Sequence, residues 1–170
     1  GTGSIDWDGA PAATTIGNIS GSVASGETVD LTGDAQVMGT TAGTMGTTTV
    51  TGAGSFLMDV GALTTLGNID LSGMSGGATM TLSNTTAVGV IYTGSSGVDT
   101  FSATGGGDTI NPGEGSDTVT GMDGADNITI TETTATADTI VLTDDDSVDT
   151  ITGFTAVAAD DVISIDVSAI

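Results

Sequence analysis

Residues 94–129 divide without a gap into four nine-residue units, GSSGVDTFS, ATGGGDTIN, PGEGSDTVT and GMDGADNIT. In every unit the fourth residue is glycine, the sixth is aspartate and the eighth is apolar. The glycines are Gly97, Gly106, Gly115 and Gly124, the aspartates are Asp99, Asp108, Asp117 and Asp126, and the apolar residues are Phe101, Ile110, Val119 and Ile128. A short, fixed period of this kind is typical of solenoids, in which each unit stacks on its neighbours.

Each unit predicts a glycine-rich turn of six residues and then a strand of three, whose central apolar side chain faces the interior. Two units form one coil, so turns that are two units apart lie on the same side. We therefore expect Asp99 to lie near Asp117, and Asp108 near Asp126. Stacked carboxylates repel one another unless a cation lies between them. Calcium, which takes oxygen ligands only, is the natural candidate.

The pattern G-G-x-G-x-D-x-U-x, where U is apolar, resembles the calcium-binding nonapeptide of the RTX (repeats-in-toxin) family. The chain departs from the pattern at the second glycine, where Ser95, Thr104 and Met122 stand, and at the first, where Ala103 and Pro112 stand. The resemblance implies a parallel β-roll that binds two or more calcium ions. It also implies the ligands, which are the carboxylates of Asp99, Asp108, Asp117 and Asp126 and main-chain carbonyls of residues such as Gly94, Gly97, Gly106, Gly113, Gly115 and Gly124.

The rest of the chain also favours strands. Roughly a fifth of the residues are threonine, which favours strands over helices, and no stretch keeps a helical apolar period. Short runs separated by turn residues predict strands at Glu27–Leu31, Thr47–Thr51, Ser55–Val60, Ala78–Ser83 and Val88–Thr93. The related sequences TTIGNIS (14–20) and TTLGNID (64–70) lie fifty residues apart, which suits a β-helix that leads into the roll.

We therefore expect an all-β protein, a right-handed parallel β-solenoid in three segments. Residues 1–93 form a Thr/Gly-rich, β-helix-like segment, residues 94–129 form the four-repeat roll, and residues 130–170 hold degenerate repeats and a C-terminal cap. In this last segment Asp-Thr-Ile recurs at 138–140 and 149–151, and Asp-Val-Ile at 161–163 is a close variant. The acidic run 144–146 is interpreted as a solvated surface.

The 170 residues include 22 acidic side chains but no lysine, arginine, histidine or cysteine, which gives a formal net charge of −22. This composition excludes Ser-His-Asp triads, thiol nucleophiles, the usual zinc sites and P-loops. It also makes nucleic acid an implausible partner, because phosphate binding depends largely on lysine and arginine. The apolar stretches are far shorter than a membrane-spanning helix, so we expect no membrane insertion.

Carboxylate pairs alone can support glycoside hydrolysis, but sugar clefts usually carry aromatic platforms and only 3% of this chain is aromatic. We therefore expect no enzyme. Disorder is also disfavoured, because 37% of the residues are hydrophobic and disordered chains have low hydrophobicity.

The Thr/Gly-rich run Leu63–Ser83, directly before the repeats, resembles the solenoid of RTX-type bacterial surface-layer proteins. The ending DTITGFTAVAADDVISIDVSAI (149–170) is similar to the segment that closes RTX arrays in proteins exported by type I secretion, which carry no N-terminal signal peptide. These resemblances imply a structural, self-assembling coat protein at the bacterial cell surface, whose folding and assembly depend on calcium. Its partner would be another copy of itself, with a cell-surface glycan as a candidate anchor. Two alternatives stay open: the calcium-triggered folding and export tail of a secreted enzyme or toxin, and the stalk segment of an RTX adhesin.

Overall fold

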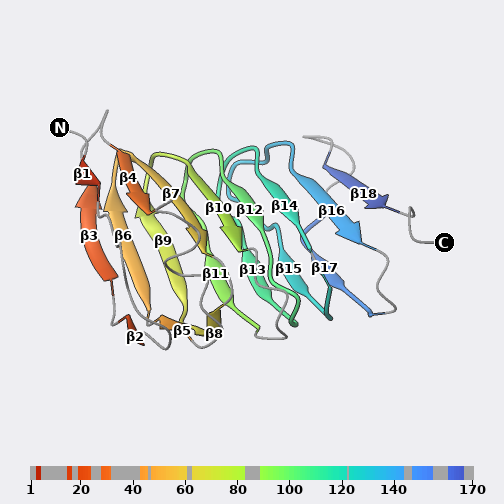
Figure 1. Cartoon of the computed structure of the whole chain (residues 1–170). Helices are drawn as coiled ribbons and strands as arrows, with labels where there is room; N and C mark the ends of the chain where they lie inside the picture. The colour runs from red at the N-terminus through yellow and green to blue at the C-terminus, as the bar shows by residue number, and fades with distance from the viewer. Residues whose placement is uncertain are drawn as a thin grey trace.

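The computed structural model describes residues 3–4, 15–16, 19–23, 28–31, 43–45, 47–60, 63–82, 89–121, 123–143, 147–154 and 161–166. Every helix or strand assigned in these ranges is a β-strand, β1 to β18. No helix in them has the length and hydrophobicity that a membrane-spanning segment requires. The strands stack along one axis, from β1 (Gly3–Ser4) at the N-terminal end to β18 (Val162–Asp166) at the other (Figure 1).

The strands form three sheets, and successive strands along the chain pass from one sheet to the next. The eight-stranded sheet has the order β1, β4 (Thr28–Leu31), β7 (Ser55–Val60), β10 (Ala78–Leu82), β12 (Thr100–Ser102), β14 (Thr118–Thr120), β16 (Thr139–Thr143) and β18. The seven-stranded sheet contains β3 (Ile19–Val23), β6 (Thr48–Gly52), β9 (Ile69–Met74), β11 (Ile91–Thr93), β13 (Thr109–Asn111), β15 (Asn127–Thr129) and β17 (Thr150–Thr152). The three-stranded sheet contains β2 (Thr15–Ile16), β5 (Gly43–Met45) and β8 (Leu63–Leu66).

Every pairing described between these strands is parallel. Parallel strands that recur in each sheet once per coil make a β-solenoid, which confirms the predicted fold class. The strands that contain the described residues of the two TT-x-G-N-I sequences occupy equivalent places two coils apart, since β2 and β3 correspond to β8 and β9.

The number of sheets per coil changes along the chain. Up to β9 each coil contributes one strand to each of the three sheets, whereas from β10 onward the described strands alternate between the two larger sheets. Within the nonapeptides the chain advances by 18 residues per coil, as two nine-residue units require. Beyond them the advance is 21 and then 23 residues. A three-sheet section therefore leads into a two-sheet roll.

The hydrophobic core lies between the sheets. The eighth residues of the four units, Phe101, Ile110, Val119 and Ile128, are at most 1% exposed, which confirms their predicted inward direction. Phe101 stacks on Tyr92 from the opposite sheet, with ring centroids 4.2 Å apart and planes 2° from parallel. The residues that flank the buried one in β13 are both exposed, so each short strand alternates as a half-buried strand should.

The predicted strands agree closely with those observed. Ser55–Val60 is reproduced exactly as β7, and three other predictions differ from β4, β6 and β10 by one residue at one or both ends. The prediction Val88–Thr93 starts too early, because the pairing of β11 begins at Ile91. The amide of Val90 instead donates to Oδ1 of Asp108 at 2.7 Å, so a side chain replaces the first link of the ladder. Glu27, Ser83 and Val88 lie outside the described residues.

Candidate metal-binding turns

The four aspartates of the nonapeptides are buried, each with 2% or less of its surface exposed. They stack from one coil to the next in two columns, one on each side of the roll, and we call each column a file. In the first file the main-chain amide of Asp99 donates to Oδ1 of Asp117 at 2.8 Å. In the second, the amide of Asp108 donates to Oδ1 of Asp126, also at 2.8 Å. The predicted stacking of aspartates two units apart is therefore confirmed.

Both files continue beyond the nonapeptides. In the first, the amide of Asp117 donates to Oδ1 of Asp138 at 2.9 Å, and the amide of Asp138 to Oδ1 of Asp161 at 3.1 Å. In the second, the amide of Asp126 donates to Oδ1 of Asp149 at 2.9 Å.

The three aspartates that extend the files were not among the predicted site residues. Their sequence signal is the Asp-Thr-Ile repeat at 138–140 and 149–151 and its variant at 161–163. The longer and unequal spacing of these repeats hid their equivalence to the nonapeptides. The predicted solvated run at 144–146 lies outside the described residues.

These hydrogen bonds give the aspartates a structural role that needs no metal. At the N-terminal end of the first file the amide of Ala78 donates to Oδ1 of Asp99 at 2.7 Å. The main-chain carbonyl of Asp99 in turn accepts from the amide of Thr118 at 2.9 Å. A buried amide without a partner is costly, so each aspartate satisfies one where a strand begins. The nonapeptide pattern indicates the repulsion between the carboxylates but does not reveal this role.

Asp99 and Asp108 also bind the second residue of their own turn. The amide of Ser95 donates to Oδ2 of Asp99 at 2.6 Å and its hydroxyl to Oδ1 at 2.7 Å. In the next unit the amide of Thr104 donates to Oδ2 of Asp108 at 2.8 Å and its hydroxyl to Oδ1 at 2.9 Å. Tyr92 adds a longer hydroxyl contact of 3.3 Å to Oδ2 of Asp99. The two residues that depart from the family's glycine therefore hold the carboxylates directly.

Asp117 and Asp138 differ, because Oδ2 of each is buried without a hydrogen-bond partner. The pKa of Asp117 is raised to about 8, mainly by burial and in part by the nearby charges of Asp99, Asp138 and Glu132, while the hydrogen bond from the Asp99 amide lowers it. Burial likewise raises the pKa of Asp138 to about 6. Without a cation, Asp117 is therefore mainly protonated at pH 7, whereas Asp138 is mainly ionised there at a cost to stability.

Burial also raises the pKa of Asp99 and Asp108, but the hydrogen bonds from Ser95 and Thr104 lower both values. The two nonapeptide turns that carry a hydroxyl at the second position therefore stabilise their own charge. The turn that ends at Asp117 does so much less.

The glycines predicted to supply carbonyl ligands lie in the same turns as the aspartates. Gly94 and Gly97 precede β12, Gly106 precedes β13, Gly113 and Gly115 precede β14, and Gly124 precedes β15. Gly115 and Gly124 both have φ of +113°, which L side chains rarely adopt. A Cβ atom at Gly115 would overlap the carbonyl oxygen of Gly97 in the preceding coil, so the turns of successive coils pack with their main chains in contact.

The oxygen atoms of these turns can supply some, but not all, of the ligands that a hard cation requires. Within the described residues, no three acidic side chains converge on a point where they could hold a metal ion. A calcium ion would therefore take one or two carboxylates together with main-chain carbonyls and water, all of which calcium accepts. The buried, unpartnered oxygens of Asp117 and Asp138 fit such an ion. The oxygens of Asp99 and Asp108 are already hydrogen-bonded.

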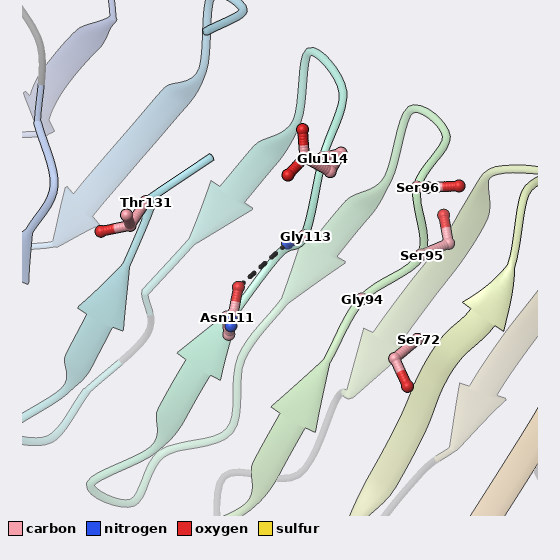
Figure 2. Close-up of a pocket in the computed structure, with 8 residues that line it drawn as sticks. All are labelled: Ser72, Gly94, Ser95, Ser96, Asn111, Gly113, Glu114 and Thr131. Atoms are coloured by element: carbon pink, nitrogen blue, oxygen red, sulfur yellow. Dashed lines mark hydrogen bonds between the residues drawn. The ribbon is translucent and has the colours of Figure 1, made fainter. Parts of the chain in front are cut away.

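A pocket of about 210 Å³ lies at the ends of β9, β11, β13 and β15 (Figure 2). It is lined by Ser72, Gly94, Ser95, Ser96, Asn111, Gly113, Glu114 and Thr131. Inside it the amide of Gly113 donates to Oδ1 of Asn111 at 3.2 Å. Sites for small organic ligands usually span about 300–1,000 Å³, so the size of this pocket supports no such ligand.

No family model, no curated protein and no solved structure matches this chain. The resemblance to the RTX family therefore rests on the nonapeptide pattern and on the turns that the pattern forms.

Proposed function

We propose that this chain is part of an extracellular structural protein, a self-assembling bacterial surface coat, whose folding depends on calcium. The observation that carries the proposal is the buried pair of oxygens, Oδ2 of Asp117 and Oδ2 of Asp138, neither of which has a hydrogen-bond partner. The chain has no lysine, arginine or histidine that could neutralise them. A cation from the medium is the remaining way to stabilise both as carboxylates.

Calcium is the cation whose chemistry agrees best with the turns. It binds oxygen atoms only and accepts carboxylates, main-chain carbonyls and water in flexible geometry. Magnesium requires a stricter octahedron and keeps more of its water. The glycine-rich turns supply carbonyls, because the Gly97 and Gly106 carbonyls pack against the turns of the next coil. The carbonyl ligands that the RTX resemblance implies belong to this proposal.

The mechanism is the linkage between binding and folding. An ion that binds only the folded chain stabilises it by RT ln(1 + [L]/Kd) for each site. Extracellular sites have Kd values on the order of 10⁻⁴–10⁻³ M, so calcium at about 1 mM contributes only about 0.4–1.4 kcal/mol per site. Where calcium is scarce, the charge of −22 opposes compaction and keeps the chain suited to export. Outside the cell, calcium reverses that balance.

A structural role in a coat agrees with the surface of the solenoid. Residues at the seventh position of the units, such as Thr100, Thr109 and Asn127, are exposed on the faces of the sheets. Equivalent positions therefore recur on each face at the spacing between neighbouring strands. The last strand of the eight-stranded sheet, β18, exposes 50% of Val162, 39% of Ile163 and 62% of Ile165. A strand with exposed apolar side chains favours pairing with a further strand, and a second copy of this protein can supply one.

The stalk of an adhesin is the second candidate. One observation favours it, namely that β1 and β18 lie at opposite ends of the stack (Figure 1). A stack of this kind holds apart whatever is attached to its two ends.

Sedimentation velocity in chelator and in millimolar calcium tests the proposal. A coat protein should change from a slow, expanded monomer into large, regular assemblies that chelator dissolves. A compact species that stays monomeric in calcium would contradict the coat function and favour the stalk or the export tail. The same sedimentation coefficient in both buffers would contradict the proposed dependence on calcium.

A further inference from the structure

In the turns that end at Asp99 and Asp108, the second residue of the turn stabilises the aspartate. Ser95 and Thr104 each give an amide and a hydroxyl hydrogen to the aspartate four residues later. Both oxygens of Asp99 and both oxygens of Asp108 therefore have donors within the chain. A cation that bound these oxygens would have to displace hydrogen bonds that are already formed.

The turn that ends at Asp117 has glycine at this position and so has no hydroxyl to offer. The amide of Gly113 is directed elsewhere, because it donates to the side chain of Asn111 (Figure 2). Gly113 has φ of +103°, and a Cβ atom there would overlap the carbonyl oxygen of Ser95, so a serine or threonine could not replace it without strain. Oδ2 of Asp117 is left buried without a partner.

Asp138, the next aspartate of the same file, also has a buried oxygen without a hydrogen-bond partner. Asp138 is 1% exposed, and its Oδ2 has no hydrogen-bond partner. Its Oδ1 accepts the Asp117 amide at 2.9 Å, so the two carboxyl groups belong to adjacent coils, and neighbouring strands of a sheet lie about 4.8 Å apart. A third carboxylate, that of Glu132, lies in the same turn as Asp138 and accepts from the Gly115 amide at 3.0 Å.

We propose that one calcium ion binds between the turn 112–117 and the turn 130–138, with Oδ2 of Asp117 and Oδ2 of Asp138 as ligands. The hydroxyls of Ser95 and Thr104 take the place of a cation at Asp99 and Asp108. The inference rests on the proposed calcium dependence, but its aspartate ligands differ from those that the nonapeptide pattern implies. It removes two of the aspartates predicted as ligands, and it adds one from a turn that is not a nonapeptide. Main-chain carbonyls and water complete the six to eight oxygens that calcium requires.

The number of calcium ions bound per folded chain tests this assignment. The probe is calcium chloride alone, measured by equilibrium dialysis and normalised by the folded fraction from circular dichroism. The test variants are Asp138→Asn and Asp117→Asn, and the matched control is Asp108→Asn, which alters the equivalent residue of a hydroxyl-containing turn. We expect each test variant to bind one ion fewer than the unchanged chain and the control to bind the same number.

The other outcomes are decisive as well. If the unchanged chain binds no calcium, the proposed function fails together with this inference. If it binds calcium but Asp108→Asn loses an ion, or if Asp117→Asn and Asp138→Asn lose none, the assignment of the site is wrong while the calcium dependence stands. Asp138→Asn keeps the Oδ1 acceptor and removes a buried charge, so its unfolding midpoint in chelator should be no lower than that of the unchanged chain. A lower midpoint would overturn the inference even if the variant could not be saturated with calcium.

Discussion

The main-chain amide of Asp99 donates a hydrogen bond of 2.8 Å to Oδ1 of Asp117, 18 residues later in the chain. In an unbroken parallel ladder that amide would bond to a main-chain carbonyl. The aspartate therefore joins two coils through its side chain and brings a second carboxylate oxygen into the interior. At Asp99 that oxygen accepts from Ser95, whereas at Asp117 it has no hydrogen-bond partner.

Stability without metal should fall as the pH rises. The pKa of Asp117 is about 8 in the folded chain against an ordinary value of 3.8, so the folded state holds this proton more tightly than the unfolded state. Stability is therefore highest below pH 4 and declines until the pH passes about 8, with Asp138 contributing to the decline up to about pH 6. Urea unfolding in chelator over this range measures the slope, and a free energy of unfolding that rises with pH would contradict the burial of uncompensated charge.

Calcium should abolish that decline. A bound cation favours the ionised carboxylates, so protons compete with calcium and acid weakens binding. In saturating calcium the folded carboxyls are ionised over most of this range, so the free energy of unfolding should stay nearly level from about pH 5 to pH 8, where it declines in chelator. Equal slopes in the two buffers would show that the ion does not bind these carboxylates.

The hydroxyl of Thr104 should contribute to stability through Asp108. Thr104→Val keeps the shape of the side chain but removes the donor that lies 2.9 Å from Oδ1 of Asp108. Hydrogen bonds to charged groups contribute about 1.5–3 kcal/mol, so we expect a loss in that range in chemical denaturation. Thr109→Val is the matched control, because Thr109 is exposed on β13 and its replacement should change stability by less than about 0.5 kcal/mol. Equal losses in the two variants would be evidence against the role of the hydroxyl.

Two isoleucines test which face of the roll is the core. Ile110 is fully buried at the eighth position of its unit, whereas Ile91, at the start of β11, is 48% exposed. Ile110→Ala should lower the free energy of unfolding by about 2–5 kcal/mol, since it leaves a cavity in a packed interior. Ile91→Ala should cost much less than this. A reversed order in thermal or urea unfolding would mean that the register of the strands is wrong.

The left-handed conformation of Gly115 gives a prediction for the turns. Gly115→Ala would place a methyl group against the Gly97 carbonyl in a conformation with φ of +113°. Strain of this kind costs about 1–3 kcal/mol or more. Ser116→Ala, at the exposed neighbouring residue, is the control and should leave the unfolding midpoint unchanged. A Gly115→Ala variant as stable as the control would show that the turn has a different backbone.

The solenoid could be predicted from the sequence because its repeats are strict in the positions that matter for packing. The period of nine residues is sufficient to place Phe101, Ile110, Val119 and Ile128 in the core and to stack the aspartates two units apart. The irregular spacing after residue 129 concealed the place of Asp138 in the same file. The pairing of its carboxylate with the Asp117 amide depends on three-dimensional register, which no local pattern reveals.

The departures from the family pattern were harder to interpret from the sequence. In the sequence, Ser95 and Thr104 are substitutions of glycine, and nothing local shows that their hydroxyls reach the aspartate four residues later. The lack of a partner at Asp117 likewise depends on where the Gly113 amide is directed. Residue types identified the candidate turns, and hydrogen bonds distinguish between them.

Urea unfolding at pH 7.5 in chelator, in millimolar calcium and in millimolar magnesium shows whether calcium stabilises this fold. We predict a higher unfolding midpoint in calcium only, with a gain of about 1.4 kcal/mol for each site at a calcium concentration ten times its Kd. Midpoints that coincide in calcium and chelator would contradict the account and would leave the aspartate files with their hydrogen-bonding role alone.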